Sequence, residues 1–185
     1  MSRFGTRDLV LAALFASLTA AGAHVTLPMA GPVPFTLQVF FVLLAGFVLG
    51  PRLGALSMIL YLLLGLVAPV YAGGLSGFTA LVGPTGGYIV GFVLSPLVAG
   101  LARGRPPIAG TLSLFALGAG ALIPIYGLGA AWLALNLHSA SYHVILWGGV
   151  LQFVPLDLVK ALTAALTARA LLSLPLGLPE PQRSR

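Results

Sequence analysis

Residues 3–24 of the chain read RFGTRDLVLAALFASLTAAGAH, and this stretch decides the fold class. It begins with Arg3 and continues past Arg7 into a run of mostly apolar and small side chains from residue 8 to residue 24. The hydrocarbon core of a membrane is about 30 Å thick, and roughly 20 apolar residues in a helix cross it. The stretch therefore predicts a membrane-spanning helix over residues 8–24. A cleaved secretory signal is the weaker interpretation, because the apolar run outlasts an ordinary signal core and further apolar runs follow.

Similar apolar runs recur along the rest of the 185-residue chain, of which 59% is hydrophobic and only 6% is charged. So few charged residues cannot cover the surface of a soluble domain of this length. We therefore expect an all-α integral membrane protein with six transmembrane helices in one transmembrane domain, residues 1–185. Residues 136–154 are expected to form an outer loop or half-helix. The predicted helices cover residues 8–24, 37–49, 53–67, 84–102, 108–135 and 155–174, and a short cytoplasmic tail covers 175–185.

The arginines of the chain all fall on one side of these predicted helices. They stand at positions 3, 7, 52, 103, 105, 169, 183 and 185. Membrane proteins retain arginine in cytoplasmic loops, so the N- and C-termini are expected to be cytoplasmic. The pattern predicts a multi-pass protein of the cell membrane, the inner or plasma membrane, surrounded by membrane lipid. This topology explains the formal charge of +6, and nucleic acid is not expected as a partner.

Asp157 and Lys160 are charged residues inside a predicted span, near its start. On insertion scales each costs about 2.5–3.5 kcal/mol at a helix centre. At a spacing of three residues they share one helix face and partly neutralise each other. One interpretation is a structural ion pair near a helix start. The other, favoured for ionisable groups inside a membrane, is a buried polar site for a small molecule, where Asp157 accepts N–H groups and Lys160 donates to a carbonyl or carboxylate.

Two segments on the side opposite the arginines offer further groups for such a site. In GPTGGYIVGF, residues 83–92, glycines allow the backbone to approach a ligand closely, and Tyr88 supplies a ring and a hydroxyl. The alternative is a glycine-rich helix start that packs on a neighbouring helix. In PVPFTLQ, residues 32–38, two prolines stiffen a loop and Gln38 brings a polar group into the next helix. An ordinary proline-rich connection is the alternative there.

Taken together and in this order, PVPFTLQ, APVYAGG, GPTGGYIVGF and GVLQFVPLDLVKA resemble the BioY family, the biotin-specific S components of energy-coupling factor (ECF) transporters. The resemblance covers about residues 9–172. It implies a six-helix bundle like other ECF S components, with a high-affinity biotin pocket near the outer face. It also implies as partners an ECF transmembrane coupling subunit and two ATPase subunits, although relatives that work alone stay an open alternative. The chain has no G-x-x-x-x-G-K-[S/T] phosphate loop, so we expect a substrate-binding subunit and not an enzyme.

The resemblance further implies roles for single residues. Asp157 would take the N–H groups of the biotin ureido ring, and Lys160 would lie near the ring carbonyl. The wall of the pocket would include Thr85, Gly86, Gly87 and Tyr88. The loop closing over the ligand would include Phe35, Thr36 and Gln38, of which Phe35 and Thr36 gate the site and Gln38 binds substrate. Leu156 stands where the family often has glycine. Because the outer side carries no arginine, backbone N–H groups, hydroxyls and water stay open as partners of the biotin carboxylate.

The first predicted helix also carries a stripe of small residues, Ala12, Ala16 and Ala20, with Ala13, Ser17 and Ala21 beside it. Small residues at this spacing let another helix pack closely in lipid. Contact with another helix of the same chain is the general alternative. The resemblance implies instead that the stripe docks on the coupling subunit, and we expect a partner at Ala12, Ala16 and Ala20.

Other functions are less well supported by the sequence. It holds no cysteine, and its histidines lack zinc-site spacings, so neither a metal nor a cofactor is expected. A small intramembrane enzyme would need a nucleophile elbow or a second intramembrane carboxylate, and the sequence has neither. The alternatives left open are an S component for a different vitamin and, less favoured, a small intramembrane enzyme or a structural membrane subunit.

Overall fold

The computed structural model describes residues 4–103, 110–137, 141–175 and 178, and this part of the chain is mostly helical. Three shorter helical turns and one two-stranded hairpin connect the α-helices. The α-helices are α1 (Thr6–His24), α2 (Gln38–Leu49), α3 (Pro51–Val67), α4 (Gly77–Val82), α5 (Gly86–Ala99), α6 (Thr111–Asn136), α7 (Tyr142–Leu146) and α8 (Val154–Ser173). The turns are the 3₁₀ segments η1 (Ala72–Gly74) and η2 (Gly100–Ala102) and the π-helical segment η3 (Trp147–Leu151). The hairpin strands are β1 (Thr26–Leu27) and β2 (Phe35–Thr36), antiparallel, with Thr26 opposite Thr36.

Four of these helical segments are long and apolar enough to cross a membrane. They are Thr6–His24, Pro51–Gly74, Thr111–Asn136 and Tyr142–Ser173. The helical segments Gln38–Leu49 and Gly86–Ala102 are apolar but shorter. The prediction of an all-α membrane protein is confirmed, and the number of complete crossings stays a prediction.

The connections hold more structure than the sequence predicted. The predicted loop after the third helix contains η1 and the one-and-a-half-turn helix α4, and the stretch predicted as a loop or half-helix contains α7 and η3. Both additions are short, and a helix of five or six residues leaves too little periodicity to be recognised. Pro155 lies in the first turn of α8, where its missing N–H leaves no hydrogen bond unmade.

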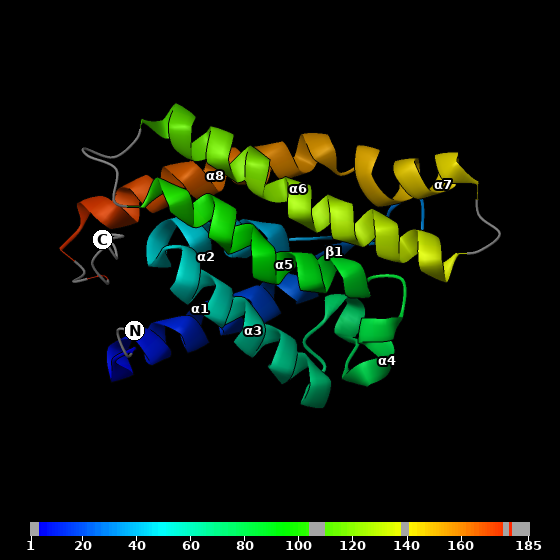
Figure 1. Ribbon diagram of the computed structural model, residues 1–185, viewed down its shortest axis with the longest axis horizontal. Helices are drawn as coiled ribbons and strands as arrows, with labels where there is room; N and C mark the ends of the chain where they lie inside the picture. Colours follow the sequence, from blue (N-terminus) through cyan, green and yellow to red (C-terminus); the bar gives the residue numbers. More distant parts are fainter. Residues whose placement is uncertain (1–3, 104–109, 138–140, 176–177, 179–185) are drawn as a thin grey trace.

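The helices lie side by side along the long axis of the molecule (Figure 1). In that view α2 and α5 occupy the middle, α6 and α8 one flank, and α1 and α3 the other. Glycines set the close approach of α5 to α6: a Cβ added at Gly91 would lie 2.7 Å from the Cα of Ile125. In lipid, where apolar surface gives no driving force for association, small residues of this kind allow backbones to pack closely.

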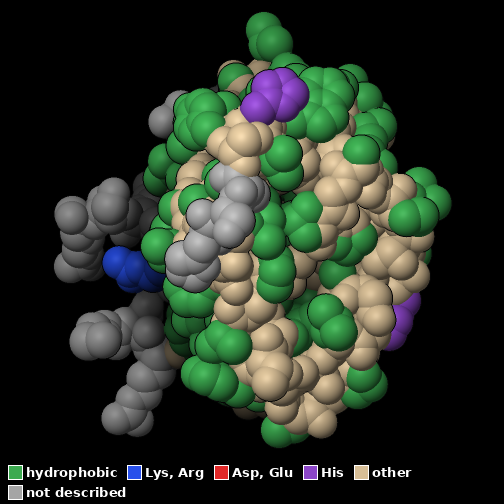
Figure 2. All heavy atoms as spheres, turned by 90° about the vertical axis from the view of Figure 1, so that its right-hand side faces the viewer, with side chains coloured by type: hydrophobic (Ala, Val, Ile, Leu, Met, Phe, Trp, Pro, Cys, Tyr) green, Lys and Arg blue, Asp and Glu red, His purple; other side chains and the backbone are tan. Residues whose placement is uncertain are grey.

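The two ends of the bundle differ in charge. Arg103 donates to the carbonyl of Val48 at the end of α2, and Arg169 donates to the hydroxyl of Thr111, 2.9 Å away, at the start of α6. These arginines therefore share one end. The hairpin, α4 and α7 lie at the other (Figure 1). Figure 2 looks onto this second end, where hydrophobic and uncharged polar atoms cover most of the face and histidines lie near its rim.

Candidate substrate-binding site

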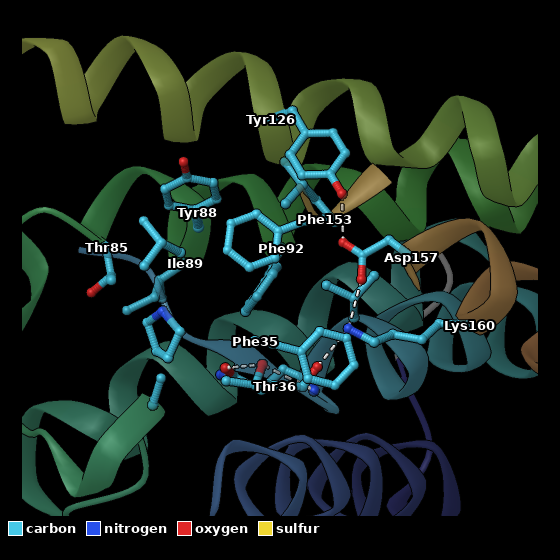
Figure 3. Close-up of a pocket in the computed structure, with 16 residues that line it drawn as sticks. Phe35, Thr36, Thr85, Tyr88, Ile89, Phe92, Tyr126, Phe153, Asp157 and Lys160 are labelled. Atoms are coloured by element: carbon cyan, nitrogen blue, oxygen red, sulfur yellow. Dashed lines mark hydrogen bonds and ion pairs between the residues drawn. The ribbon is translucent and has the colours of Figure 1, made fainter. Parts of the chain in front are cut away.

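A cavity that is partly open to the outside lies between α2, α5, α6 and α8 beneath the β1–β2 hairpin. Its lining residues are Val33, Pro34, Phe35, Thr36, Gln38, Val39, Ala72, Thr85, Tyr88, Ile89, Phe92, Ile125, Tyr126, Phe153, Asp157 and Lys160. Most of these side chains are apolar or aromatic. Asp157 and Lys160 lie at one end of the group, and Thr85 lies at the other (Figure 3).

The ion pair is placed by the start of α8. The backbone N–H of Asp157 donates to the carbonyl of Phe153 at 2.8 Å, which closes the first turn of the helix. One turn later, the ammonium of Lys160 lies 2.6 Å from Asp157 Oδ1. The two residues are only 3% and 6% exposed. A buried pair of this kind is stable only when its other hydrogen-bonding groups are also satisfied.

Three further contacts occupy the remaining hydrogen-bonding groups and the charge of the pair. The hydroxyl of Tyr126 on α6 donates to Asp157 Oδ2 at 2.6 Å. The Lys160 ammonium donates to the backbone carbonyl of Thr36 at 2.6 Å, and it lies 3.7 Å from the centre of the Phe35 ring. Both residues belong to β2, so the buried charge of α8 holds the strand that roofs the cavity (Figure 3).

A second set of hydrogen bonds runs from the hairpin to α3. The hydroxyl of Thr36 donates to the side-chain oxygen of Gln38 at 2.8 Å, and the Gln38 amide donates to the hydroxyl of Tyr61 at 2.5 Å. Tyr61 in turn donates to the carbonyl of Val70 at 3.0 Å. Gln38 and Tyr61 are both buried. The strand over the cavity is therefore tied to the segment that follows α3, and Ala72 of this segment also lines the cavity.

The residues of the 83–92 motif separate into two groups. Thr85 and Tyr88 line the cavity, and the Tyr88 hydroxyl donates to the carbonyl of Gly149 at 2.8 Å. Gly86 and Gly87 instead face neighbouring backbone and the side chain of Trp132 on α6, where an added Cβ would overlap existing atoms. Close helix packing uses the space that their missing side chains leave, and the contact of these two glycines with a ligand stays a prediction.

Ala12, Ala16 and Ala20, which the sequence analysis assigned to partner docking, lie on the buried face of α1, and their docking role stays a prediction. Their exposed fractions are 0%, 4% and 8%, because α1 packs this face on α2 and α3 of the same chain. The parallel stripe of Ala13, Ser17 and Ala21 is exposed. The sequence spacing alone could not distinguish the two stripes, because they lie next to each other on the helix.

Tyr126, Phe92 and Phe153 are cavity residues that the sequence analysis did not identify. Tyr126 offered a signal, since it is a hydroxyl-bearing residue within the long apolar run of α6. The two phenylalanines offered none, because phenylalanine is common throughout apolar helices. Among the residues that the structure describes, no cluster of three or more His, Cys, Asp or Glu side chains could hold a metal ion.

The site is chemically asymmetric. Its polar end carries one anion and one cation in contact, so it suits a neutral polar group with both donors and acceptors. The aromatic walls suit a compact apolar body. Membrane-crossing helices around such a cavity define a membrane protein that binds a small organic molecule.

Comparison with known proteins narrows this class. The model of the BioY family matches residues 1–175, and the chain belongs to this family. It is 43% identical over 166 residues to a probable biotin transporter BioY of Pyrococcus horikoshii, covering 89% of this chain and 96% of the relative. It is 42% identical to the biotin transporter BioY of Thermotoga maritima, covering 88% and 94%. The fold matches a crystal structure of the S component for biotin from an ECF-type ABC transporter, with a TM-score of 0.82 and 24% identity over 93% of this chain and 96% of that one.

Proposed function

We propose that this protein is the biotin-binding membrane subunit of an uptake transporter. The observation that carries the proposal is the buried Asp157–Lys160 pair at one end of an otherwise apolar cavity. The family membership and the names of the relatives point to biotin, whose ureido ring is a neutral group with one carbonyl and two N–H groups. Lys160 donates to the ureido carbonyl, and Asp157 accepts a ureido N–H.

The remaining parts of biotin, its sulfur-containing ring and its carboxylate side chain, fit the cavity in one orientation. With the ureido ring at the ion pair, the sulfur-containing ring lies among the aromatic walls formed by residues such as Phe35, Phe92 and Phe153. The side chain of biotin then runs away from the pair, toward the end of the cavity where Thr85 lies (Figure 3). The hydroxyl of Thr85 is a donor for the biotin carboxylate at that end.

Transport requires energy that this chain does not supply, because its sequence has no phosphate-binding loop. We assign this role to an ECF module of one membrane coupling subunit and two ATPase subunits. The exposed stripe of Ala13, Ser17 and Ala21 on α1 is the surface on which the coupling subunit packs. The arginine-bearing end faces the cytoplasm, and the cavity opens to the outside of the cell membrane.

Calorimetric titration of the detergent-solubilised protein with biotin tests the proposal. Biotin is expected to bind, and thiamine and riboflavin are not. Asp157→Asn should weaken biotin binding by about 10- to 100-fold, because a hydrogen bond to a charged group contributes about 1.5–3 kcal/mol. Thr163→Ala, on the exposed face of the same helix, is the control and should bind as the wild type does. Folded protein that does not bind biotin, or that binds thiamine or riboflavin more tightly than biotin, would refute the assignment.

A further inference from the structure

The hairpin over the cavity is held at two places of different strength. At β2, the buried ammonium of Lys160 donates to the carbonyl of Thr36. At the hairpin tip, residues 28–34 between the two strands, the side-chain amide of Gln152 donates to the carbonyl of Ala30 at 3.2 Å. We propose that Gln152 is the latch of this tip, and that the tip opens for ligand exchange while β2 stays in place. The inference rests on the proposed function and adds a positioning residue to it.

The π-helical geometry of η3 makes the latch possible. In an α-helix, the backbone N–H of Gln152 would donate to the carbonyl of Gly148. In η3 it donates instead to the carbonyl of Trp147, at 3.4 Å. The Gly148 carbonyl accepts from the Gln152 side chain, at 2.8 Å. A side-chain amide has two N–H donors, so the bond to Gly148 orients the amide and its other N–H is directed at Ala30.

Two glycines bring the hairpin tip into direct contact with η3. A Cβ added at Gly31 would lie 3.1 Å from the Cα of Gly148, and a Cβ added at Gly148 would lie 3.4 Å from the carbonyl oxygen of Ala30. Gly31 also has a φ of 143°, a backbone conformation that side chains other than hydrogen disfavour. The main chain of the tip therefore rests on the main chain of η3, and Gln152 bonds the two together.

The two anchors differ in how readily water replaces them. Ala30 is exposed and Gln152 is partly exposed, so water takes over their hydrogen-bonding groups when the contact opens. The bond from Lys160 to Thr36 is buried and has a charged donor, which makes it about twice as strong as a neutral bond. Breaking it would also leave buried polar groups without partners, which is costly. The tip is therefore the part of the hairpin that opens first.

Opening of the tip uncovers the cavity. Val33 and Pro34 belong to the tip and line the cavity, so they leave the lining when the tip moves. The prolines at positions 28, 32 and 34 restrict the backbone of the tip, which favours movement as a unit. The Asp157–Lys160 pair lies on α8 and is not disturbed by this movement.

The test is Gln152→Met, which keeps the length of the side chain and removes both donors. The latch bond is present in the closed protein with and without biotin, and it is absent in the open form. Its loss should therefore raise the association and the dissociation rate constants of biotin by the same factor, about two- to tenfold, the range for one neutral hydrogen bond. The Kd should stay near the wild-type value. Rapid filtration with radiolabelled biotin in detergent measures both rates.

Hydrogen exchange of the protein without biotin gives a second readout. In Gln152→Met, amide exchange should become faster at residues 29–33 and stay unchanged at residues 35–38, which Lys160 continues to hold. Asn136→Ala is the matched control. It also removes a side-chain amide, but this amide donates to the carbonyl of Trp132 within α6, at 3.0 Å. Its biotin rate constants and its exchange at residues 29–33 should equal those of the wild type.

Two results would overturn the inference. Exchange at residues 29–33 that stays unchanged in Gln152→Met would show that Gln152 does not hold the tip. Faster dissociation without faster association, so that the Kd rises, would show that Gln152 stabilises the bound state only and is no latch. A wild type that binds no biotin would overturn the proposed function, whereas the exchange of the free protein would still decide whether Gln152 holds the tip.

Discussion

Lys160 joins α8 to the roof of the cavity through a single ammonium group. It contacts the Asp157 carboxylate, the Thr36 carbonyl and the ring of Phe35. Removing one member of a buried ion pair leaves the other charge uncompensated, which costs about 3–5 kcal/mol, whereas replacing both with apolar groups is often neutral. We therefore expect Lys160→Met to lower the free energy of unfolding by about 3–5 kcal/mol and to abolish biotin binding. Thermal unfolding in detergent and calorimetric titration measure the two effects.

The double variant Asp157→Leu/Lys160→Met separates stability from recognition. Its stability should return most of the way to that of the wild type, because no unpaired charge is left. Its biotin binding should stay absent, because both polar contacts to the ligand are gone. A double variant that binds biotin would show that the pair is a structural element only.

Residue chemistry also explains which site residues the sequence could predict. Asp157 and Lys160 were found because charges inside an apolar span are costly and therefore rare. The sequence could not decide the role of Gly86 and Gly87, because glycine serves close ligand approach and close helix packing equally well. Tyr126 was missed because nothing in a linear pattern shows that α6 brings it to a carboxylate 31 positions further along the chain.

At the scale of elements, Tyr61 links the two segments that cover the cavity. It accepts from Gln38, which is bonded to Thr36 of β2, and donates to Val70 after α3. Tyr61→Phe keeps the ring and removes both hydrogen bonds. We expect faster amide exchange at residues 35–38 and 68–74 and a biotin release rate raised about two- to tenfold, because each neutral bond contributes about 0.5–1.5 kcal/mol. Hydrogen exchange by mass spectrometry and dissociation of labelled biotin check these expectations.

Tyr71→Phe provides the comparison for this prediction. The Tyr71 ring packs edge-on against Tyr61 with 5.7 Å between ring centres, but its hydroxyl donates to Leu62 within α3. Its loss should raise exchange at residues 68–74 alone. If Tyr61→Phe gives the same local pattern, the hairpin and the segment after α3 move independently of each other.

Whole elements were predictable where they were long. The run at 37–49 corresponds to α2, Gln38–Leu49, and the run at 108–135 to α6, Thr111–Asn136. The hairpin was not predicted, because two-residue strands give no alternation of apolar and polar residues to detect. It forms where Lys160, distant in sequence, supplies a donor to β2.

At the scale of the whole molecule, the arginine-bearing end should face the cytoplasm and the hairpin end the exterior. The chain has no cysteine, so a single introduced cysteine is a clean reporter. Ser76→Cys, next to α4, should react with a membrane-impermeant maleimide in intact cells, because Ser76 is exposed at the hairpin end. Ser113→Cys, near the start of α6, should react only after the membrane is permeabilised. The reverse pattern would contradict the orientation and place the cavity opening inside the cell.

The exposed stripe on α1 gives a prediction about assembly. The Ser17 hydroxyl donates to the carbonyl of Ala13 at 2.9 Å, so the one polar side chain of the stripe already has a hydrogen-bond partner in lipid. All three side chains of the stripe are small, which allows a second helix to pack closely on it. Ser17→Leu adds bulk at its centre without touching the cavity. Biotin binding in detergent should stay at the wild-type level, whereas co-purification with the ECF subunits and biotin uptake by cells should fall at least tenfold.

Two variants make this prediction specific to the stripe. Thr163→Leu adds similar bulk to the exposed face of α8, and it should leave both assembly and uptake intact if docking is confined to α1. Ala16→Leu places the bulk on the buried side of α1, where it must disturb packing within the chain and lower thermal stability, a cost of about 1–3 kcal/mol for an overpacked core. Unchanged co-purification and uptake in Ser17→Leu would show that the coupling subunit docks elsewhere, because a helix cannot pack closely over a leucine at the centre of a small-residue stripe.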